Sequence, residues 1–345
     1  MIQIVNWLLT RKCNLNCDYC AIVKDYEMPI SYPSIKHYIK NEMSTKVIID
    51  ALAKFKMHNP ETFHILYGGE PLLRVDLPDI INYCNDNNIY YTVISNNTPE
   101  IQPLITRLFQ MTDYVEGFTS SVDPSCMNKN LPDIDRIRKR VEGFKRLKEI
   151  QESGKVKDVV AEITVMPDNQ HLLYDLVKEL SASEIYSDIT FVDIAKSSYY
   201  DFSNVIEEDE LVHPSYELAE TLSNMVHDDS LLIHMKDVLL PWMFDTLPSN
   251  YDCELELGCH NVTIDADGQM RLCLRIRGEL TPMVHVDNLF EDDAKCVTKE
   301  YFDLMCMDKR RYCNLCNHSC LMMSKHIDKH GDKEGDLAHK NKREA

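Results

Sequence analysis

The chain has 345 residues, 44% of them hydrophobic and 27% charged, a composition typical of a globular protein with a full core of its own. Its 37 basic and 56 acidic residues give a formal net charge of −19, which disfavours bulk binding to nucleic acid because like charges repel. The sequence has no apolar run of about 18 residues, and its N-terminus lacks the positive region of a signal peptide. We therefore expect a cytoplasmic protein that does not enter a membrane.

Six short stretches rich in β-branched and aromatic residues are expected to be strands, and helical patterns separate them. Ser44 is expected to cap the first of three clear helices. Pro132 and Asp133 are expected to open the second, and Asp168 or Asn169 to precede the third. Alternating strands and helices predict an α/β fold with a parallel sheet, here an open or partial barrel, with the reactive site at the carboxyl ends of the strands. The expected strands are residues 2–9, 62–67, 89–95, 115–122, 159–166 and 188–195.

The thirteen cysteines are an odd number in a chain without an export signal, which argues against a disulfide framework. Eleven of them are clustered, three within residues 13–20 and eight within residues 253–320. Clustered thiols in a reducing compartment favour metal or iron–sulfur ligands. Cys84 stands apart in an apolar helical pattern and is expected to be a buried core residue.

Cys13, Cys17 and Cys20 directly follow the first expected strand, in the order Cys-x3-Cys-x2-Cys. Zinc sites usually need four ligands in two separated pairs, whereas three thiolates on a [4Fe–4S] cluster leave one iron open to chelate a small amino acid. The segment CNLNCDYC, with Tyr19 as its aromatic residue, resembles the signature of the radical SAM superfamily. Half of a zinc site is the alternative.

The resemblance implies the chemistry of that superfamily. Its open iron binds S-adenosylmethionine (SAM), and one electron cleaves the sulfonium to methionine and a 5′-deoxyadenosyl radical. The radical then abstracts a hydrogen atom from the substrate. A flavodoxin or ferredoxin is the implied source of the electron. The implied fold is a partial (β/α)6 radical SAM barrel.

A second motif, Gly68-Gly69-Glu70-Pro71, stands at the end of the second expected strand. A carboxylate there can bond an ammonium group, and the glycines let a ligand approach the backbone closely. The motif resembles the GGEP of radical SAM enzymes, which implies that Glu70 and its neighbouring backbone hold the amino group of SAM. Polar residues at later strand ends are further candidate contacts to SAM or substrate, although ordinary turns use the same residues. They are Ser95, Asn96, Ser121, Asp123 and Thr164.

The C-terminal cysteines flank an expected hairpin around Asp265 and Gly268. Their spacing resembles the SPASM and twitch extensions of radical SAM enzymes, which carry two auxiliary [4Fe–4S] clusters and one, respectively. The cysteine-rich stretch is shorter than in SPASM, so two ligand sets stay open beside a zinc knuckle at residues 313–320. The SPASM-type set is Cys253, Cys259, Cys273 and Cys320, and the twitch-type set is Cys259, Cys273, Cys313 and Cys316.

These patterns predict four segments. A radical SAM core is expected at 1–207, a helical linker at 208–250, a small cysteine-rich auxiliary cluster domain at 251–324, and a charged tail without packed structure at 325–345. Only twelve residues precede Cys13, so any leader-peptide-binding domain is expected on a separate protein.

Peptide or protein maturation is the function that the resemblance favours. A dehydrogenase or epimerase acting on a sugar or nucleoside is the alternative, and a non-catalytic iron–sulfur or zinc protein is a more distant one. The sequence assigns no catalytic acid or base.

The expected helix at 134–150 concentrates basic residues in an otherwise acidic chain. One interpretation is a solvated face with ion pairs along the helix, and the other is a docking surface for an acidic electron donor. The basic residues are Arg136, Arg138, Lys139, Arg140, Lys145, Arg146 and Lys148.

Overall fold

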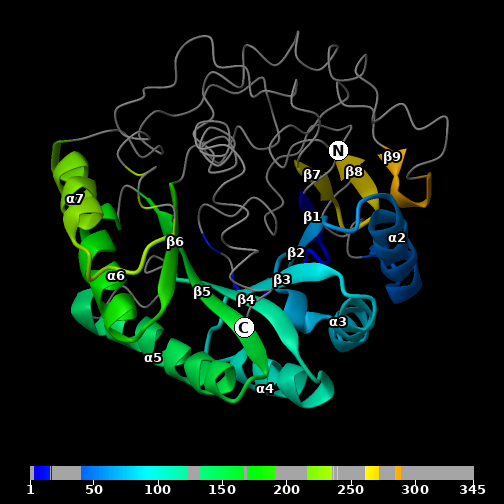
Figure 1. Ribbon diagram of the computed structural model, residues 1–345, viewed down its shortest axis with the longest axis horizontal. Coiled ribbons are helices and arrows are strands. Elements are labelled where there is room, and N and C mark those ends of the chain that lie inside the picture. The colour runs from blue at the N-terminus through cyan, green and yellow to red at the C-terminus, as the bar shows by residue number, and fades with distance from the viewer. Residues whose placement is uncertain are drawn as a thin grey trace, which may run out of the picture.

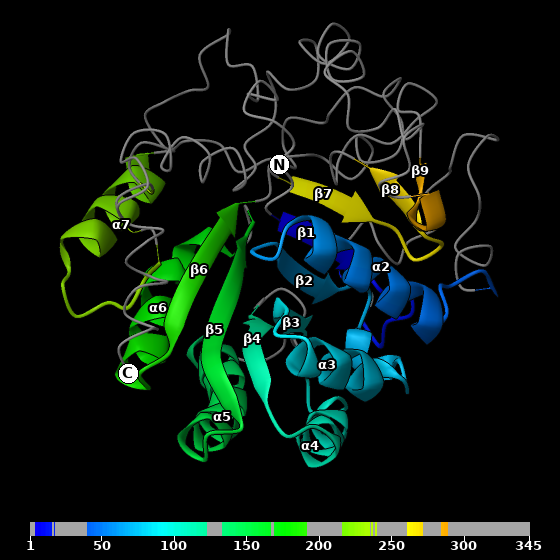
Figure 2. The same ribbon diagram turned by 45° about the vertical axis from the view of Figure 1, so that its right-hand side comes forward.

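The computed structural model describes residues 4–15, 17, 40–122, 133–166, 169–191, 216–234, 236, 239, 261–271 and 284–288. These residues form one curved, nine-stranded sheet in the order β6-β5-β4-β3-β2-β1-β7-β8-β9 (Figures 1 and 2). Neighbouring strands from β6 to β1 are parallel, as the alternation of strands and helices predicts. The first six strands are β1 (Ile4–Leu8), β2 (Phe63–Tyr67), β3 (Tyr90–Ser95), β4 (Val115–Ser121), β5 (Val156–Val165) and β6 (Tyr186–Phe191).

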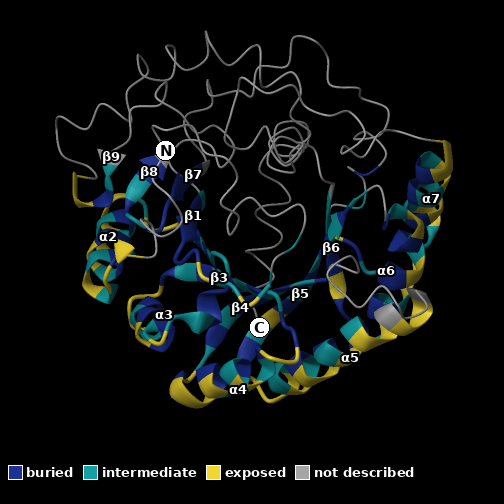
Figure 3. Ribbon diagram, turned by 180° about the vertical axis from the view of Figure 1, so that it is seen from behind, coloured by how far each residue is buried: buried dark blue, intermediate teal, exposed yellow. Residues whose placement is uncertain are grey.

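Helices cover the outer, convex face of the sheet, and each packs its buried residues toward the strands (Figures 1 and 3). The arrangement is the partial (β/α)6 barrel expected for the core, and it leaves the concave face of the strands for a site. The helices are α2 (Thr45–His58), α3 (Leu77–Asp86), α4 (Gln102–Met111), α5 (Asp133–Glu152), α6 (Leu173–Ala182) and α7 (Tyr216–His227).

The core beneath β1 is aromatic. The ring of Trp7 meets Phe55 of α2 edge to face, with 6.0 Å between the ring centroids. Its indole N–H donates to Nδ1 of His64, 2.9 Å away. Burial, with a smaller effect of Lys56, lowers the pKa of His64 to about 3, so this imidazole is neutral and belongs to the packing.

The three predicted helix starts agree with the structure. Ser44 caps α2 by accepting a hydrogen bond from the N–H of Val47, 3.4 Å away, and α5 begins at Asp133. Asn169 directly precedes a 3₁₀ turn (Gln170–Leu172) that runs into α6 at Leu173. Asn169 does not cap that helix, because its side chain closes the end of β5 instead: it accepts from Met166 N (2.8 Å) and donates to the Thr164 carbonyl (3.0 Å).

The predicted hairpin is present and extends the main sheet. β7 (Asn261–Ile264) and β8 (Gln269–Arg271) are antiparallel around Gly268, whose φ of +86° favours glycine. β9 (Val284–His285) pairs with β8. β7 also pairs in parallel with β1, which the sequence did not predict. The four-segment division of the chain stays a prediction.

Within the described residues, no helix combines the length and the apolar character needed to cross a bilayer. Cys84 is buried in α3, as expected.

Candidate functional site

The two motifs meet through their backbones at the carboxyl ends of β1 and β2. The N–H of Gly69 donates to the carbonyl of Thr10 (2.8 Å), and the N–H of Glu70 donates to the carbonyl of Lys12 (2.7 Å). These bonds continue the β1–β2 pairing beyond the strands into both loops. Segments about sixty residues apart in sequence therefore form one corner.

The glycines are required by this close approach. A Cβ atom on Gly68 would lie 2.5 Å from the Thr10 carbonyl oxygen, and one on Gly69 would overlap the carbonyl of Lys12. Any side chain there would push the cysteine loop away from the second motif.

Glu70 lies inside this corner, with its side chain fully buried. Its carboxylate accepts hydrogen bonds from Leu72 N (3.1 Å), Ser95 Oγ (3.1 Å) and Asn96 N (2.9 Å). Burial raises the pKa of Glu70 to about 7, and the three donors oppose that rise. Through these bonds the carboxylate joins the second motif to the end of β3. Its role in holding the amino group of SAM stays a prediction.

Cys13 and Cys17 follow β1 as part-exposed thiols. The Sγ atom of Cys13 lies 3.3 Å from Leu15 N and 3.9 Å from Asn96 Nδ2. Thiolates are the usual ligands of iron–sulfur clusters, so these two accessible sulfurs and the donors around Cys13 fit the predicted cluster. Cys20 and Tyr19 lie outside the described residues.

Other predicted residues divide between two places. Ser95 and Asn96 lie at the corner, bonded to Glu70. Ser121 and Thr164 lie on β4 and β5, half-buried, on the face that alternates with the helix-packed positions. These two residues therefore line the concave side of the sheet. Their strands are separated in the sheet from β1, which precedes the cysteine loop, by β2 and β3. Pro71 is buried and begins a 3₁₀ turn.

Several predicted residues lie outside the described residues and keep the status of predictions. They are Asp123 and the auxiliary ligands Cys253, Cys259, Cys273, Cys313, Cys316 and Cys320.

Sequence reasoning missed an acidic pair on the concave face. Glu162 of β5 and Asp188 of β6 are direct register partners, and Ser121 is the partner of Glu162 on the other side. Burial, followed by the charge of Asp188, raises the pKa of Glu162 to about 7. The alternation in DVVAEITV, with Glu162 among apolar residues, was the signal for an inward carboxylate.

His234 completes this group, with Nδ1 2.9 Å from Asp188 Oδ1 and its ring stacked on Tyr186 at 4.8 Å. Burial lowers the pKa of His234, while the hydrogen bond and charge of Asp188 raise it, and the net shift is upward. Among the residues that the structure describes, no three His, Cys, Asp or Glu side chains are grouped to hold a metal ion.

The chain is similar to two curated proteins over part of its length. It is 28% identical over 129 residues to an S-adenosylmethionine-dependent nucleotide dehydratase of Selenomonas ruminantium, covering 37% of this chain and 42% of the relative. It is 34% identical over 99 residues to an Fe-coproporphyrin III synthase of Methanosarcina barkeri, covering 28% and 21%. The match thus spans less than half of either relative.

Solved structures share the fold. Native anSMEcpe with bound AdoMet and the Cp18Cys peptide has a TM-score of 0.56 at 14% identity, over 88% of this chain and 80% of that one. Streptococcus suis SuiB bound to the precursor peptide SuiA has a TM-score of 0.55 at 13% identity, over 85% and 65%. At these identities the likeness establishes the fold.

The model of the Radical SAM superfamily matches residues 7–180, which include the end of β1, the strands β2 to β5, the cysteine loop and the glycine motif. The match spans just over half of the chain and includes the corner where both motifs are joined. The chain therefore belongs to the radical SAM superfamily.

Proposed function

We propose that this protein is an enzyme that cleaves SAM reductively and uses the resulting radical to abstract hydrogen from a substrate. The observation that carries the proposal is the backbone pairing of the two motifs, Gly69 N to Thr10 O and Glu70 N to Lys12 O. A three-thiol loop alone would suit several metals. Its attachment to a glycine-rich corner that a ligand can approach closely favours a cluster that binds an amino acid.

In this proposal Cys13, Cys17 and Cys20 hold a [4Fe–4S] cluster, which supplies the electron that cleaves bound SAM. The Gly68–Glu70 backbone and Glu70 hold the amino group of SAM. Ser121 and Thr164 face the concave side, where the remainder of SAM and the substrate would bind. The corner fixes the relative position of the thiols and the SAM-binding backbone before any ligand arrives.

The test is SAM cleavage by the anaerobically reconstituted protein with dithionite. We expect 5′-deoxyadenosine from the wild type and none from the variant with Cys13, Cys17 and Cys20 all changed to Ala. Cys84→Ala is the matched control, because burial raises the pKa of this thiol to about 12 and keeps it away from metal chemistry. Product from the triple variant would refute the assignment.

For the substrate we propose a peptide or protein. Two solved structures of the same fold contain bound peptides, SuiA and Cp18Cys. The concave face also carries Glu162 and Asp188, side by side in register, in a chain of net charge −19. These carboxylates disfavour a polyphosphate substrate, because like charges repel at short range.

A nucleotide or another small molecule is the second candidate, favoured by the similarity to a nucleotide dehydratase. Substrate-dependent formation of 5′-deoxyadenosine separates the two. We expect short peptides encoded beside this gene to raise its rate, and nucleoside triphosphates to leave it unchanged. The opposite result would favour the second candidate.

We further propose an auxiliary domain at 251–324 with at least one auxiliary [4Fe–4S] cluster. The β7–β8 hairpin supports it, because this hairpin separates Cys259 from Cys273 in sequence and lies beside β1. Metal analysis distinguishes an auxiliary iron–sulfur cluster from the zinc knuckle.

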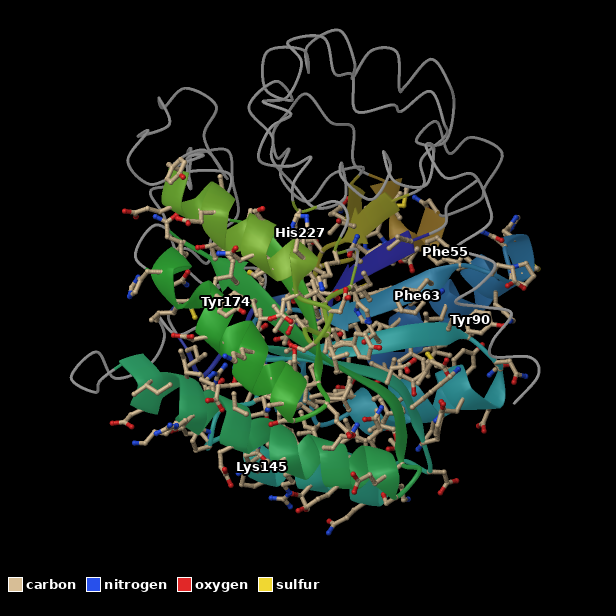
Figure 4. All side chains as sticks on the ribbon, turned by 60° about the vertical axis from the view of Figure 1, so that its left-hand side comes forward. Phe55, Phe63, Tyr90, Lys145, Tyr174 and His227 are labelled. Atoms are coloured by element: carbon tan, nitrogen blue, oxygen red, sulfur yellow. The ribbon has the colours of Figure 1, made fainter. Side chains whose placement is uncertain are left out.

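The reductant is proposed to be a flavodoxin or ferredoxin that docks on α5. Arg138, Lys139 and Lys145 are exposed on this helix, and Lys145 lies on its outer side (Figure 4). An acidic donor would be repelled by most of an acidic protein and attracted to such a surface.

A further inference from the structure

Asn96, the first residue after β3, is fixed by hydrogen bonds from three directions. Its N–H donates to Glu70 Oε2 (2.9 Å), and its carbonyl accepts from Arg140 Nη2 (3.1 Å). Its side-chain Oδ1 accepts from the N–H of Thr98 (3.1 Å). Because a backbone N–H can only donate, this last bond determines which end of the amide is the oxygen. The NH2 end must therefore face the other way.

That NH2 end faces the cysteine loop. Asn96 Nδ2 donates to Asn14 Oδ1 (2.8 Å) and lies 3.9 Å from Cys13 Sγ. Asn14 is oriented in turn, since its Nδ2 donates to Thr98 Oγ1 (3.0 Å). The N–H of Leu15 reaches the same sulfur at 3.3 Å. Two N–H groups, from different parts of the chain, thus lie within hydrogen-bonding distance of Cys13 Sγ, and Asn14 Oδ1 also lies 3.9 Å from it.

We propose that Asn96 is a positioning residue that orients the Cys13 thiolate and sets the reduction potential of the cluster bound to it, with Asn14 as the link. The inference rests on the proposed function, because it assumes a cluster at Cys13. It assigns Asn96 a role toward the sulfur in place of the direct SAM contact that the sequence suggested.

The sign of the effect follows from charge. Reduction by one electron adds a negative charge to the cluster and its thiolates. An N–H directed at a ligating sulfur stabilises the more negative state more strongly, so it raises the reduction potential. Removing the donor should lower the potential, and replacing it by a carboxylate should lower it further.

The experiment is a redox titration, followed by electron paramagnetic resonance, of the full-length reconstituted protein without SAM. We expect the order wild type, Asn96→Ala, Asn96→Asp from highest to lowest potential. For Asn96→Asp the reduction equilibrium should change about tenfold, which is about 59 mV for a one-electron couple. Thr98→Val should give a smaller decrease, because it removes only the acceptor that orients Asn14.

Asn85→Asp is the matched control. Asn85 also uses both ends of its amide, donating to the Tyr114 carbonyl (2.7 Å) and accepting from Tyr91 Oη (2.9 Å). It lies near the opposite end of β3, so the same change has no path to Cys13. Unchanged potentials in both Asn96 variants, at full iron content, would overturn the proposal.

Hydrogen exchange of the metal-free protein tests the positioning role in any variant that does not take up the cluster. The backbone amide hydrogens of residues 11–15 should exchange faster in Asn96→Ala than in Asn85→Ala. Equal exchange rates in the two variants would overturn the positioning role. A wild type that forms no cluster or cleaves no SAM contradicts the proposed function, whereas normal cleavage with unmoved potentials contradicts only the role of Asn96.

Discussion

A buried ion pair connects the cysteine loop to the β7–β8 turn. The guanidinium of Arg11 donates to both carboxylate oxygens of Asp265, with the shortest distance 2.7 Å, and each side chain is 1% exposed. Arg11 stands two residues before Cys13, and Asp265 directly follows β7. A buried charge that loses its partner is much more costly than a pair that is replaced whole.

Asp265→Ala should therefore lower the free energy of unfolding by about 3–5 kcal/mol, the range for breaking a buried pair. Urea denaturation with unchanged slope measures it. Asp50→Ala, which removes the exposed pair with Lys46, should cost less than about 1 kcal/mol. The double variant Arg11→Met with Asp265→Leu should recover much of the loss. A loss from Asp265→Ala no larger than that from Asp50→Ala would contradict this account.

Glu162, on the concave face, makes the free energy of unfolding depend on pH. Its pKa in the folded protein, about 7, is above the ordinary value of 4.5 because of burial and the charge of Asp188. Between those two values the folded state binds more protons than the unfolded state. The free energy of unfolding therefore falls as pH rises from about 4.5 to about 7, and the contribution is fully lost above that range.

Glu162→Gln should remove part of this fall. We expect the variant to match the wild type near pH 4 and to exceed its stability at pH 8 by up to about 3 kcal/mol, at 1.36 kcal/mol per unit of pKa. Thermal unfolding across that range is the measurement. Glu70 keeps a residual slope in the same window, since its pKa is also raised to about 7. A pH profile of Glu162→Gln identical to that of the wild type would disprove the assignment.

The two sides of helix α5 make different contacts, and the sequence alone did not distinguish them. On its inner side Arg140 donates to the carbonyl oxygen of Ser121 (2.5 Å), which fixes the end of β4. On its outer side Lys145 pairs with Glu142 and Lys148 with Glu184, so part of the positive charge is balanced locally. These pairs support the solvated-face interpretation for those lysines, while Arg138 and Lys139 carry the docking proposal.

Reversing charge on α5 tests docking. Arg138→Glu with Lys139→Glu should slow flavodoxin-driven turnover about tenfold at low salt, because steering acts on association. The defect should shrink at high salt, and dithionite-driven turnover should be unchanged. Lys46→Glu with Lys178→Glu, on α2 and α6, makes the same change in net charge elsewhere. An equal loss of turnover with both reductants, or an equal loss in the control variant, would favour the solvated-face interpretation of α5.

At the scale of the whole molecule, one sheet connects the N-terminal motif to the C-terminal hairpin. β1, which leads into Cys13, lies between β2 and β7. Parallel pairing of β1 with β7 joins residues some 250 positions apart, as in the register of Asn6 with Thr263. This edge is where an auxiliary cluster domain would attach to the core.

Metal content of the whole chain tests that domain. Iron and sulfide analysis should give about eight irons per chain for one auxiliary cluster and about twelve for two, counting four per cubane. The variant with Cys13, Cys17 and Cys20 changed to Ala should lose about four. Four irons with one zinc in the wild type would establish the zinc knuckle instead.

The sequence by itself determined the strand–helix order, the family and the residues of both motifs. Strand alternation, the Ser44 cap and the cysteine spacing are local patterns, and local patterns survive in a linear chain. It placed Asn169 directly before the third helix, but it could not show that the Asn169 side chain bonds Met166 N and the Thr164 carbonyl, because only packing selects among possible backbone partners.

Only the tertiary structure decided which distant residues share a contact. The bond between Asn96 and Asn14, the register of Glu162 with Asp188, and the burial of Arg11 against Asp265 join segments 26 to 254 positions apart. Sequence spacing carries no information about such contacts, because parallel strands are brought together by crossovers of variable length. The positions of the thiols could therefore be predicted from the sequence. The contacts of Leu15 and Asn96 with Cys13 Sγ were visible only in the fold.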